Sequence, residues 1–160
     1  MSFSRVNSLL YVCTGNTCRS YMAEMYTKKL LRERKKNDIK VSSAGIAAEK
    51  SFKIPKEVKQ IMLSNGIEYV ERKAVKINRE LIDNYDLIVV MEKKQKLKLI
   101  EKFPIAANKI ILFKEYAGLP KGDVVDPIGM SQEMYQNTFL TIRDGVENIL
   151  RKMEIKPTGL

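Results

Sequence analysis

The stretch "VCTGNTCRS" (residues 12–20) holds both cysteines of the chain in one short polar loop. The apolar run "SLLYV" (8–12) leads into it and is typical of a buried strand. The segment that follows (20–36) repeats apolar residues at helical spacing and predicts an amphipathic helix. The loop is therefore expected to join a strand to a helix, as in the first half of a βαβ unit.

The same alternation of short apolar runs and helical patterns continues along the chain. The expected strands are 8–12, 39–45, 86–91 and 109–113, with 86–91 in the centre of the sheet, and the expected helices lie within 20–36, 55–65, 77–86, 92–103 and 131–153. Pro55 is expected at the first helical position of its helix. We predict an α/β fold in which residues 1–160 form one domain, a four-stranded parallel sheet with helices on both faces. Ligands of such sheets bind beyond the carboxyl ends of the strands, where the cysteine loop lies.

The amino-acid composition limits the class of protein and the kinds of catalytic site that the chain can form. With 44% hydrophobic and 30% charged residues, the 160-residue chain is typical of a soluble globular protein. With only two cysteines the chain has no disulfide framework, and without histidine it can form neither a Cys–His dyad nor a Ser–His–Asp triad. The small number of thiols and the lack of histidine also argue against a zinc site. The start of the chain lacks a signal-peptide pattern, and no apolar run could span a bilayer, so a cytoplasmic location and no membrane partner are expected.

The net charge of +10 has a plain interpretation as a solvated basic surface that favours anionic partners. The lysines are spread over helical segments and no nucleic-acid-binding signature accompanies them, so nucleic acid is not an expected partner. No metal and no cofactor are expected.

The cysteine loop has the parts of an anion site. Its backbone N–H groups and the start of the next helix can converge on one oxyanion, such as phosphate. Gly15 permits close approach and a positive φ, and Asn16 tolerates the left-handed conformation. Arg19 can hold phosphate oxygens with two hydrogen bonds. The positive electrostatic field of these groups favours the thiolate of Cys13 over the thiol, and the Ser20 hydroxyl can donate a hydrogen bond to the sulfur. Cys13 is therefore a candidate nucleophile for attack on phosphorus.

A leaving group needs an acid, and without histidine a carboxylate is the best candidate. Asp126 stands before Pro127 in "GDVVDPIGMS" (122–131), so it is expected on a non-helical loop between the last strand and the last helix. That loop can reach over the carboxyl edge of the sheet. Asp123 is the weaker candidate and is expected to be a turn residue.

These motifs together resemble the low-molecular-weight protein tyrosine phosphatase family. The matching pieces are "VCTGNTCRS", "SSAG" (42–45), "YDLIVVM" (85–91) and "DPIGMS" (126–131), in the order of the family and over nearly the whole chain. The resemblance implies a cysteine-dependent phosphatase acting on phosphorylated proteins, without a cofactor and as a monomer. It implies that Cys13 is the nucleophile, that Arg19 holds the phosphate, and that Asp126 acts first as general acid and then as base. Ser20 would donate a hydrogen bond to the thiolate, Asn16 would fix the shape of the loop, and Ser43 would support Asn16. Cys18 would form a protective disulfide with Cys13 on oxidation. The phosphate-binding loop would comprise Thr14, Gly15, Asn16, Thr17, Cys18 and Ser20.

Two positions favour one branch of that family. Thr17 is polar where tyrosine phosphatases commonly have a bulky apolar residue, and Ile128 follows the Asp-Pro pair where they tend to have an aromatic one. "CTGNTCRS" and "DPIGMS" look like the bacterial protein arginine phosphatase branch, in which the threonine is associated with phosphoarginine. A phosphotyrosine phosphatase remains the alternative, and a non-catalytic phosphate-binding module is a third reading. Thioredoxin-coupled arsenate reductases share the loop but need further cysteines, and the chain has none after Cys18.

The chain departs from the family pattern at three places. Tyr21 follows Ser20 where the family usually has proline, so we expect this end of the loop to be less fixed. The arginine phosphatase branch often has phenylalanine in place of Ile128, so one packing wall should be reduced. The usual histidine near "EYVERK" (68–73) is missing, so its hydrogen bonds must come from elsewhere or be lost.

Overall fold

The structure is a computed structural model that describes residues 6–155 and 157. Four parallel strands form one sheet in the order β2-β1-β3-β4. The strands are β1 (Ser8–Cys13), β2 (Lys40–Gly45), β3 (Leu87–Val90) and β4 (Ile110–Leu112). The helices are α1 (Arg19–Glu33), α2 (Lys56–Ser64), α3 (Arg79–Asn84), α4 (Lys93–Lys102), α5 (Phe113–Tyr116) and α6 (Gln132–Lys152), with a 3-10 helix η1 (Pro104–Lys109). The predicted α/β fold is confirmed.

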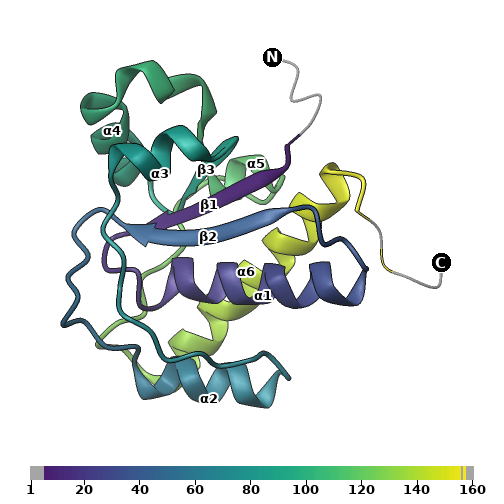
Figure 1. The fold of residues 1–160 in the computed structure, drawn as a ribbon. Coiled ribbons are helices and arrows are strands. Elements are labelled where there is room, and N and C mark those ends of the chain that lie inside the picture. Colours follow the sequence, from purple (N-terminus) through teal and green to yellow (C-terminus); the bar gives the residue numbers. More distant parts are fainter. Residues whose placement is uncertain (1–5, 156, 158–160) are drawn as a thin grey trace.

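Helices cover both faces of the sheet (Figure 1). Alternate residues of β1 point to opposite faces, as the two-residue period of a strand requires. Leu9 and Tyr11 join the core beneath α1, α2 and α6, whereas Leu10 and Val12 join the core beneath α3 and α4. Because both faces of β1 are covered, its side chains are buried throughout, and this explains its continuous apolar run.

The position of β1 inside the sheet places the cysteine loop. β1 pairs with β2 on one side and with β3 on the other, so its last residue, Cys13, lies between two other strand ends. α1 then begins at Arg19 and packs against α6 and β2. The loop 14–18 is thus held at the carboxyl edge of the sheet, where the sequence predicts a ligand site.

The structure corrects the expected elements in three details. Pro55 caps α2 from outside, because its extended ψ of 147° precedes the first helical residue, Lys56. The last strand ends at Leu112, since Phe113 turns into the short helix α5 and buries its ring in the core. The 3-10 helix after α4 was not expected from the sequence either. Both missed helices are short, and short elements lack a readable hydrophobic period.

Candidate active site

The cysteine loop is fastened to the end of β2. The backbone N–H groups of Ile46 and Ala47 donate to the carbonyl oxygens of Cys13 (3.0 Å) and Thr14 (2.9 Å). Gly45 lies so close that a Cβ there would be 2.5 Å from the Thr14 carbonyl oxygen. The glycine of "SSAG" therefore allows the loop to rest directly on the neighbouring strand.

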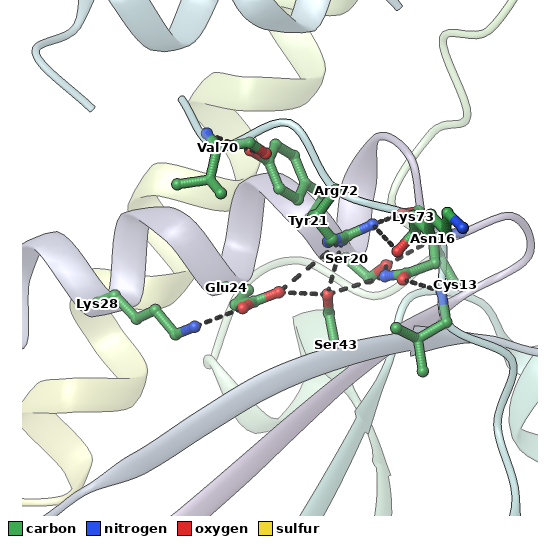
Figure 2. Close-up of polar contacts among 11 residues, drawn as sticks. Cys13, Asn16, Ser20, Tyr21, Glu24, Lys28, Ser43, Val70, Arg72 and Lys73 are labelled. Atoms are coloured by element: carbon green, nitrogen blue, oxygen red, sulfur yellow. Dashed lines mark hydrogen bonds and ion pairs between the residues drawn. The ribbon is translucent and has the colours of Figure 1, made fainter. Parts of the chain in front are cut away.

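Asn16 sets the shape of the loop. Its φ of 60° is left-handed, whereas Gly15 does not use the positive φ that a glycine permits. Nδ2 of Asn16 donates to the hydroxyls of Ser20 (2.9 Å) and Ser43 (2.8 Å), and Oδ1 accepts from the Val75 N–H (2.9 Å). These bonds compensate the cost of the left-handed backbone, and Figure 2 shows Asn16 at the centre of this network.

The sulfur of Cys13 lies among hydrogen-bond donors. Ser20 Oγ is 2.9 Å from Sγ, and the Asn16 N–H donates to Sγ at 3.3 Å. Because Ser20 Oγ already accepts from Asn16 Nδ2, its own proton is free to point at the sulfur. The arrangement stabilises negative charge on Sγ.

Arg19 is almost completely buried at the first turn of α1, with 2% of its side chain exposed. Nη1 donates to Glu92 Oε2 (2.6 Å) and to the Val124 carbonyl (2.9 Å), and Nη2 is 3.6 Å from Asp126 Oδ2. Sequence reasoning missed Glu92. Its signal is its place just after the β3 run, because the carboxyl ends of parallel strands share one edge.

A glutamine on α4 connects Glu92 to the loop. Gln95 Nε2 donates to Glu92 Oε2 and to Thr14 Oγ1, both at 3.0 Å. The Glu92 N–H in turn donates to Gln95 Oε1, which completes a capping box at the start of α4. The helix cap therefore also holds the carboxylate that faces Arg19.

Asp126 projects over the loop from the segment between α5 and α6. The Val124 N–H donates to the Met91 carbonyl (2.9 Å), which fixes this segment to the end of β3. Asp126 Oδ1 accepts from the Ile128 N–H (3.1 Å), and its side chain remains 47% exposed. The carboxylate is thus oriented but open to solvent. Asp123 instead accepts from the Lys93 N–H at the start of α4 (2.8 Å).

A pocket with a volume of about 340 Å³ opens between the loop and Asp126. Its lining includes eight of the predicted residues, namely Cys13, Thr14, Gly15, Thr17, Cys18, Arg19, Asp126 and Ile128. Asn16, Ser20 and Ser43 support the loop and do not line this pocket. Phe52, Lys53 and Pro55 complete the wall and were missed by sequence reasoning, which looked for an aromatic only after Asp126. No strand or helix carries Phe52, so no periodic signal places it.

The chain matches the family described as low molecular weight phosphotyrosine protein phosphatase over residues 8–157. This chain belongs to that family. It is 32% identical to a protein-arginine-phosphatase of Bacillus subtilis, over 91% of this chain and 93% of the relative. It is 30% identical to the low molecular weight protein-tyrosine-phosphatase Etp of Escherichia coli, over 87% of this chain and 89% of the relative. The fold matches a solved structure of YwlE arginine phosphatase, a cysteine-to-serine mutant with a phosphorylated active-site serine. The TM-score is 0.86 and the sequence identity 27%, and the match covers 92% of this chain and 95% of that chain.

The second cysteine of this phosphatase is buried beside the first. Both are free thiols, and Cys18 is 2% exposed. Burial raises the pKa of the Cys18 thiol well above its usual range, and the neighbouring Cys13 raises it further. Cys18 is therefore a neutral thiol at neutral pH.

Tyr21 is tied down in this phosphatase, contrary to our expectation for the residue that replaces proline. It is fully buried, and its hydroxyl donates to the Val70 carbonyl (2.6 Å) and accepts from the Val70 N–H (3.0 Å). These bonds join the first turn of α1 to the segment 68–73. The first turn is thus fixed by a tertiary contact in place of a proline ring.

Within residues 6–155 and 157, no helix is long and apolar enough to cross a membrane. Over the same residues, no group of three or more His, Cys, Asp or Glu side chains is placed to hold a metal ion.

Proposed function

We propose that this phosphatase hydrolyses phosphoarginine in proteins through a thiophosphate intermediate on Cys13. The observation that carries the proposal is the place of Thr17, a small polar side chain that lines the same pocket as Cys13 and Asp126. The likeness to the protein-arginine-phosphatase of Bacillus subtilis supports it. A polar wall suits a charged guanidinium better than an apolar aryl ring.

In the first step, the Cys13 thiolate attacks phosphorus from the floor of the loop. The S–P bond forms as the P–N bond to the guanidinium breaks, and Asp126 gives its proton to the leaving nitrogen. Arg19 and the loop N–H groups hold the three equatorial oxygens, which carry the charge of the transition state. The loop supplies the positive charge that the reaction needs.

In the second step, Asp126 acts as a base. It takes a proton from water, the water oxygen attacks phosphorus, and the S–P bond breaks to release phosphate and the Cys13 thiolate. The exposed fraction of Asp126, 47%, supports this role because water can reach its carboxylate. The Ser20 hydroxyl, 2.9 Å from Sγ, stabilises the thiolate as it leaves.

Two walls of the pocket suit a planar cation. The protonated Asp126 carboxyl group can accept from one guanidinium N–H while its own O–H points at the leaving nitrogen, which would orient that nitrogen. The Phe52 ring lies against the loop, 3.6 Å from the place that a Cβ on Gly15 would take. Aromatic faces attract guanidinium groups. Ile128 adds a further apolar contact on the wall of the pocket.

The proposal extends to the setting of the enzyme. We assign one phosphatase domain to residues 1–160, whose two ends lie partly outside the described residues. We further propose a cytoplasmic monomer that acts on phosphorylated proteins and binds phosphate or a similar oxyanion in its loop, with no nucleic-acid or membrane partner.

Phosphotyrosine is the second candidate substrate, and Phe52 is the observation that favours it. An aromatic side chain on the pocket wall can stack on a phenyl ring as well as on a guanidinium. The likeness to Etp of Escherichia coli supports this candidate. The two candidates share the same chemistry and differ in the leaving group.

The deciding experiment compares kcat/KM for matched peptides that carry phosphoarginine or phosphotyrosine at the same position. A preference for phosphoarginine is expected, and a clear preference for phosphotyrosine would overturn the proposed substrate. Cys13→Ser, measured on both peptides and on an aryl phosphate, tests the nucleophile. Turnover that survives this substitution would contradict its assignment and leave a role in phosphate binding alone.

A further inference from the structure

The helix α4 carries a concentration of positive charge that no carboxylate balances. Its sequence holds one glutamate, Glu101, and five lysines, namely Lys93, Lys94, Lys96, Lys98 and Lys102. Among the residues that the structure describes, none of these five lysines forms an ion pair. On α1, by contrast, Lys28 and Lys29 each pair with a glutamate four residues away. The basic charge of the chain is therefore balanced on α1 and left open on α4.

An apolar side chain is exposed among these lysines. Gln95 and Leu99 are the positions of α4 that are buried against the rest of the fold. Lys94, Leu97 and Lys98 are exposed, and Leu97 is 58% exposed. Residues three and four apart are neighbours on a helix, so Leu97 and Lys98 both lie beside Lys94. This face suits a partner that offers carboxylates together with an apolar group.

A pocket with a volume of about 460 Å³ lies past the end of α4, between α3 and η1. Its apolar lining includes Phe103 and Ile105, and Ile105 is 89% exposed. The one carboxylate in its lining, Asp83, pairs with a cation of the same lining. The cationic residues that line the pocket are Arg79, Lys102 and Lys109. The pocket therefore suits an apolar side chain that is flanked by negative charge.

The start of α4 lies against the segment that carries Asp126. The Lys93 N–H donates to Asp123 Oδ1 (2.8 Å), and the Val124 N–H donates to the Met91 carbonyl (2.9 Å). From there α4 covers the same face of the sheet as α3 (Figure 1). Its ten residues rise about 15 Å, which an extended chain crosses in about five residues. A phosphorylated residue at Cys13 and a segment bound along α4 can therefore belong to one substrate chain.

We propose that α4 and the pocket between α3 and η1 form a docking surface for an acidic segment of the protein substrate, with an apolar side chain of that segment seated in the pocket. The proposal rests on the proposed function only in taking a phosphorylated protein as the substrate. Opposite charges speed the encounter and hold the substrate near the loop, so the docking surface acts on KM more than on kcat.

Two observations favour a protein segment over other anionic partners. The docking surface ends in a pocket, and a concave site takes a single side chain better than a flat membrane surface. The exposed Leu97 and Ile105 would gain nothing from a phosphate backbone, which nucleic acids present to lysines. A peptide can satisfy both the lysines and the apolar side chains.

The first test compares peptides that share one phosphorylated residue. About six residues from it, one peptide carries four glutamates around a leucine, and its partner has glutamines in place of the glutamates. We expect kcat/KM for the acidic peptide to be higher by about fivefold or more at low salt, mainly through a lower KM, and this advantage to shrink at about 0.5 M salt. Segments placed before and after the phosphorylated residue cover both chain directions. Equal kcat/KM within every pair would overturn the proposal.

Charge reversal on α4 tests where the acidic segment binds. The double substitution Lys94→Glu and Lys98→Glu should make the neutral peptide the better substrate, while turnover of a small aryl phosphate stays unchanged and shows that the variant folds. The double substitution Lys35→Glu and Lys36→Glu, at exposed positions after α1, lowers the net charge equally and should keep the preference. An unchanged preference in the α4 variant, or an equal loss in both variants, would overturn the docking surface.

The pocket is tested through the leucine of the acidic peptide. Ile105→Ser should lower kcat/KM for this peptide by about threefold or more but leave a peptide with alanine in place of the leucine unaffected. Leu63→Ser, at another exposed apolar position, is the matched control and should change neither. If the unsubstituted enzyme treats the leucine and alanine peptides alike, the apolar part of the proposal is wrong.

Other anionic partners are tested directly. The unsubstituted enzyme and the α4 variant are sedimented with phosphatidylcholine vesicles that contain about 30% phosphatidylserine, and both are titrated with a DNA duplex. Neither vesicles nor DNA should distinguish the two proteins. Binding that the α4 variant loses, together with no preference among the peptides, would overturn the proposal in favour of a membrane or a nucleic acid.

The docking surface and the proposed function can fail separately, because the same peptide pairs can carry phosphotyrosine. Poor turnover of phosphoarginine, with a preference for acidic phosphotyrosine peptides, would overturn the proposed substrate and leave the docking surface standing. Fast turnover of phosphoarginine without any preference for acidic peptides would do the reverse. If neither residue is turned over, the affinity of Cys13→Ser for the acidic and neutral peptides, measured by fluorescence anisotropy, still decides the docking surface.

Discussion

Arg19 and Glu92 form an ion pair with an N–O distance of 2.6 Å, although they lie 73 residues apart in the chain. Arg19 begins α1 and Glu92 caps α4, so the pair joins the helices that follow β1 and β3. One nitrogen of the guanidinium is occupied by this carboxylate and by the Val124 carbonyl. The other nitrogen is therefore presented to the pocket in a fixed orientation.

Removing the Glu92 carboxylate should loosen Arg19, the proposed phosphate clamp. In Glu92→Ala the buried, charged guanidinium of Arg19 loses the carboxylate that it pairs with. Its orientation should therefore become less fixed, and the free energy of unfolding should fall. We expect kcat/KM to fall by about 10- to 100-fold, together with a lower melting temperature. Glu101→Ala, an exposed glutamate on the same helix, is the matched control. Unchanged kcat/KM in Glu92→Ala would show that Arg19 needs no such support.

Thr17 should control which phosphorylated side chain enters the pocket. Thr17→Ile adds apolar bulk to the wall, so the ratio of kcat/KM for phosphoarginine to that for phosphotyrosine should fall by about tenfold or more. Thr17→Val keeps the shape of threonine but removes the hydroxyl. A change in both variants would assign selectivity to polarity, and a change in Thr17→Ile alone would assign it to size. A ratio that stays constant in both would contradict a role for Thr17.

The sequence predicts most of the fold because its signals are local and repeated. The apolar runs of β1 and β3 reflect burial on both faces, and the periodic pattern of α6 continues over six turns or so. The placement of Cys13, Arg19 and Asp126 was also predictable, because each stands at the end of a predicted element, and all three line one pocket. Their chemical roles stay predictions.

Other parts of the site depend on tertiary contacts that no local pattern records. Glu92 has the same local signature as any helix cap, and only the sheet topology brings it to Arg19. Phe52 lies in the irregular segment between β2 and α2, and only the course of that segment in space brings its ring to the pocket. Tyr21 was misjudged because a proline ring acts locally, whereas its hydroxyl bonds to Val70 across 49 residues.

Asp126 should matter most when the leaving group needs a proton. Asp126→Asn keeps the size of the side chain but cannot donate a proton, so turnover of phosphoarginine peptides should fall by about 10²- to 10⁴-fold. An aryl phosphate with an acidic phenol needs little protonation, so its cleavage should fall less. Asp123→Asn, three residues earlier and bound to the start of α4, serves as the control. Equal losses on both substrates would argue against Asp126 as the general acid.

The two cysteines should differ in reactivity. Burial raises the pKa of Cys18, so at pH 7 to 8 it stays a neutral thiol, while the donors around Cys13 stabilise its thiolate. Iodoacetamide should therefore modify Cys13 first, with Cys18 following only as the pH rises toward its raised pKa. Peptide mapping by mass spectrometry after timed alkylation at pH 7 and pH 9 checks this order. Preferential labelling of Cys18 at pH 7 would contradict it.

A protective disulfide remains a separate prediction. Peroxide oxidises the Cys13 thiolate to a sulfenic acid, which condenses with the Cys18 thiol to form a disulfide and release water. Activity should then return on addition of dithiothreitol in the unsubstituted enzyme but remain lost in Cys18→Ser. Irreversible inactivation of both proteins would show that Cys18 does not shield Cys13.

Gly45 should tolerate no side chain. In Gly45→Ala the new Cβ would lie 2.5 Å from the Thr14 carbonyl oxygen and 2.9 Å from the Asn16 nitrogen, both backbone atoms of the loop. The loop must then move away from β2, so orthovanadate affinity and melting temperature should both fall. Calorimetry measures both. A variant with unchanged affinity and melting temperature would mean that the loop relaxes without cost.

The strand order has a consequence for how the enzyme is made. β1 and the cysteine loop leave the ribosome first, but β1 pairs with β2 and β3, which are synthesised later. The loop therefore gains both of its flanking strands only after residue 90 has emerged, and the proposed acid, Asp126, emerges later still. A growing chain therefore carries the proposed nucleophile, Cys13, for most of its synthesis without the proposed acid that turnover of a phosphoprotein would require.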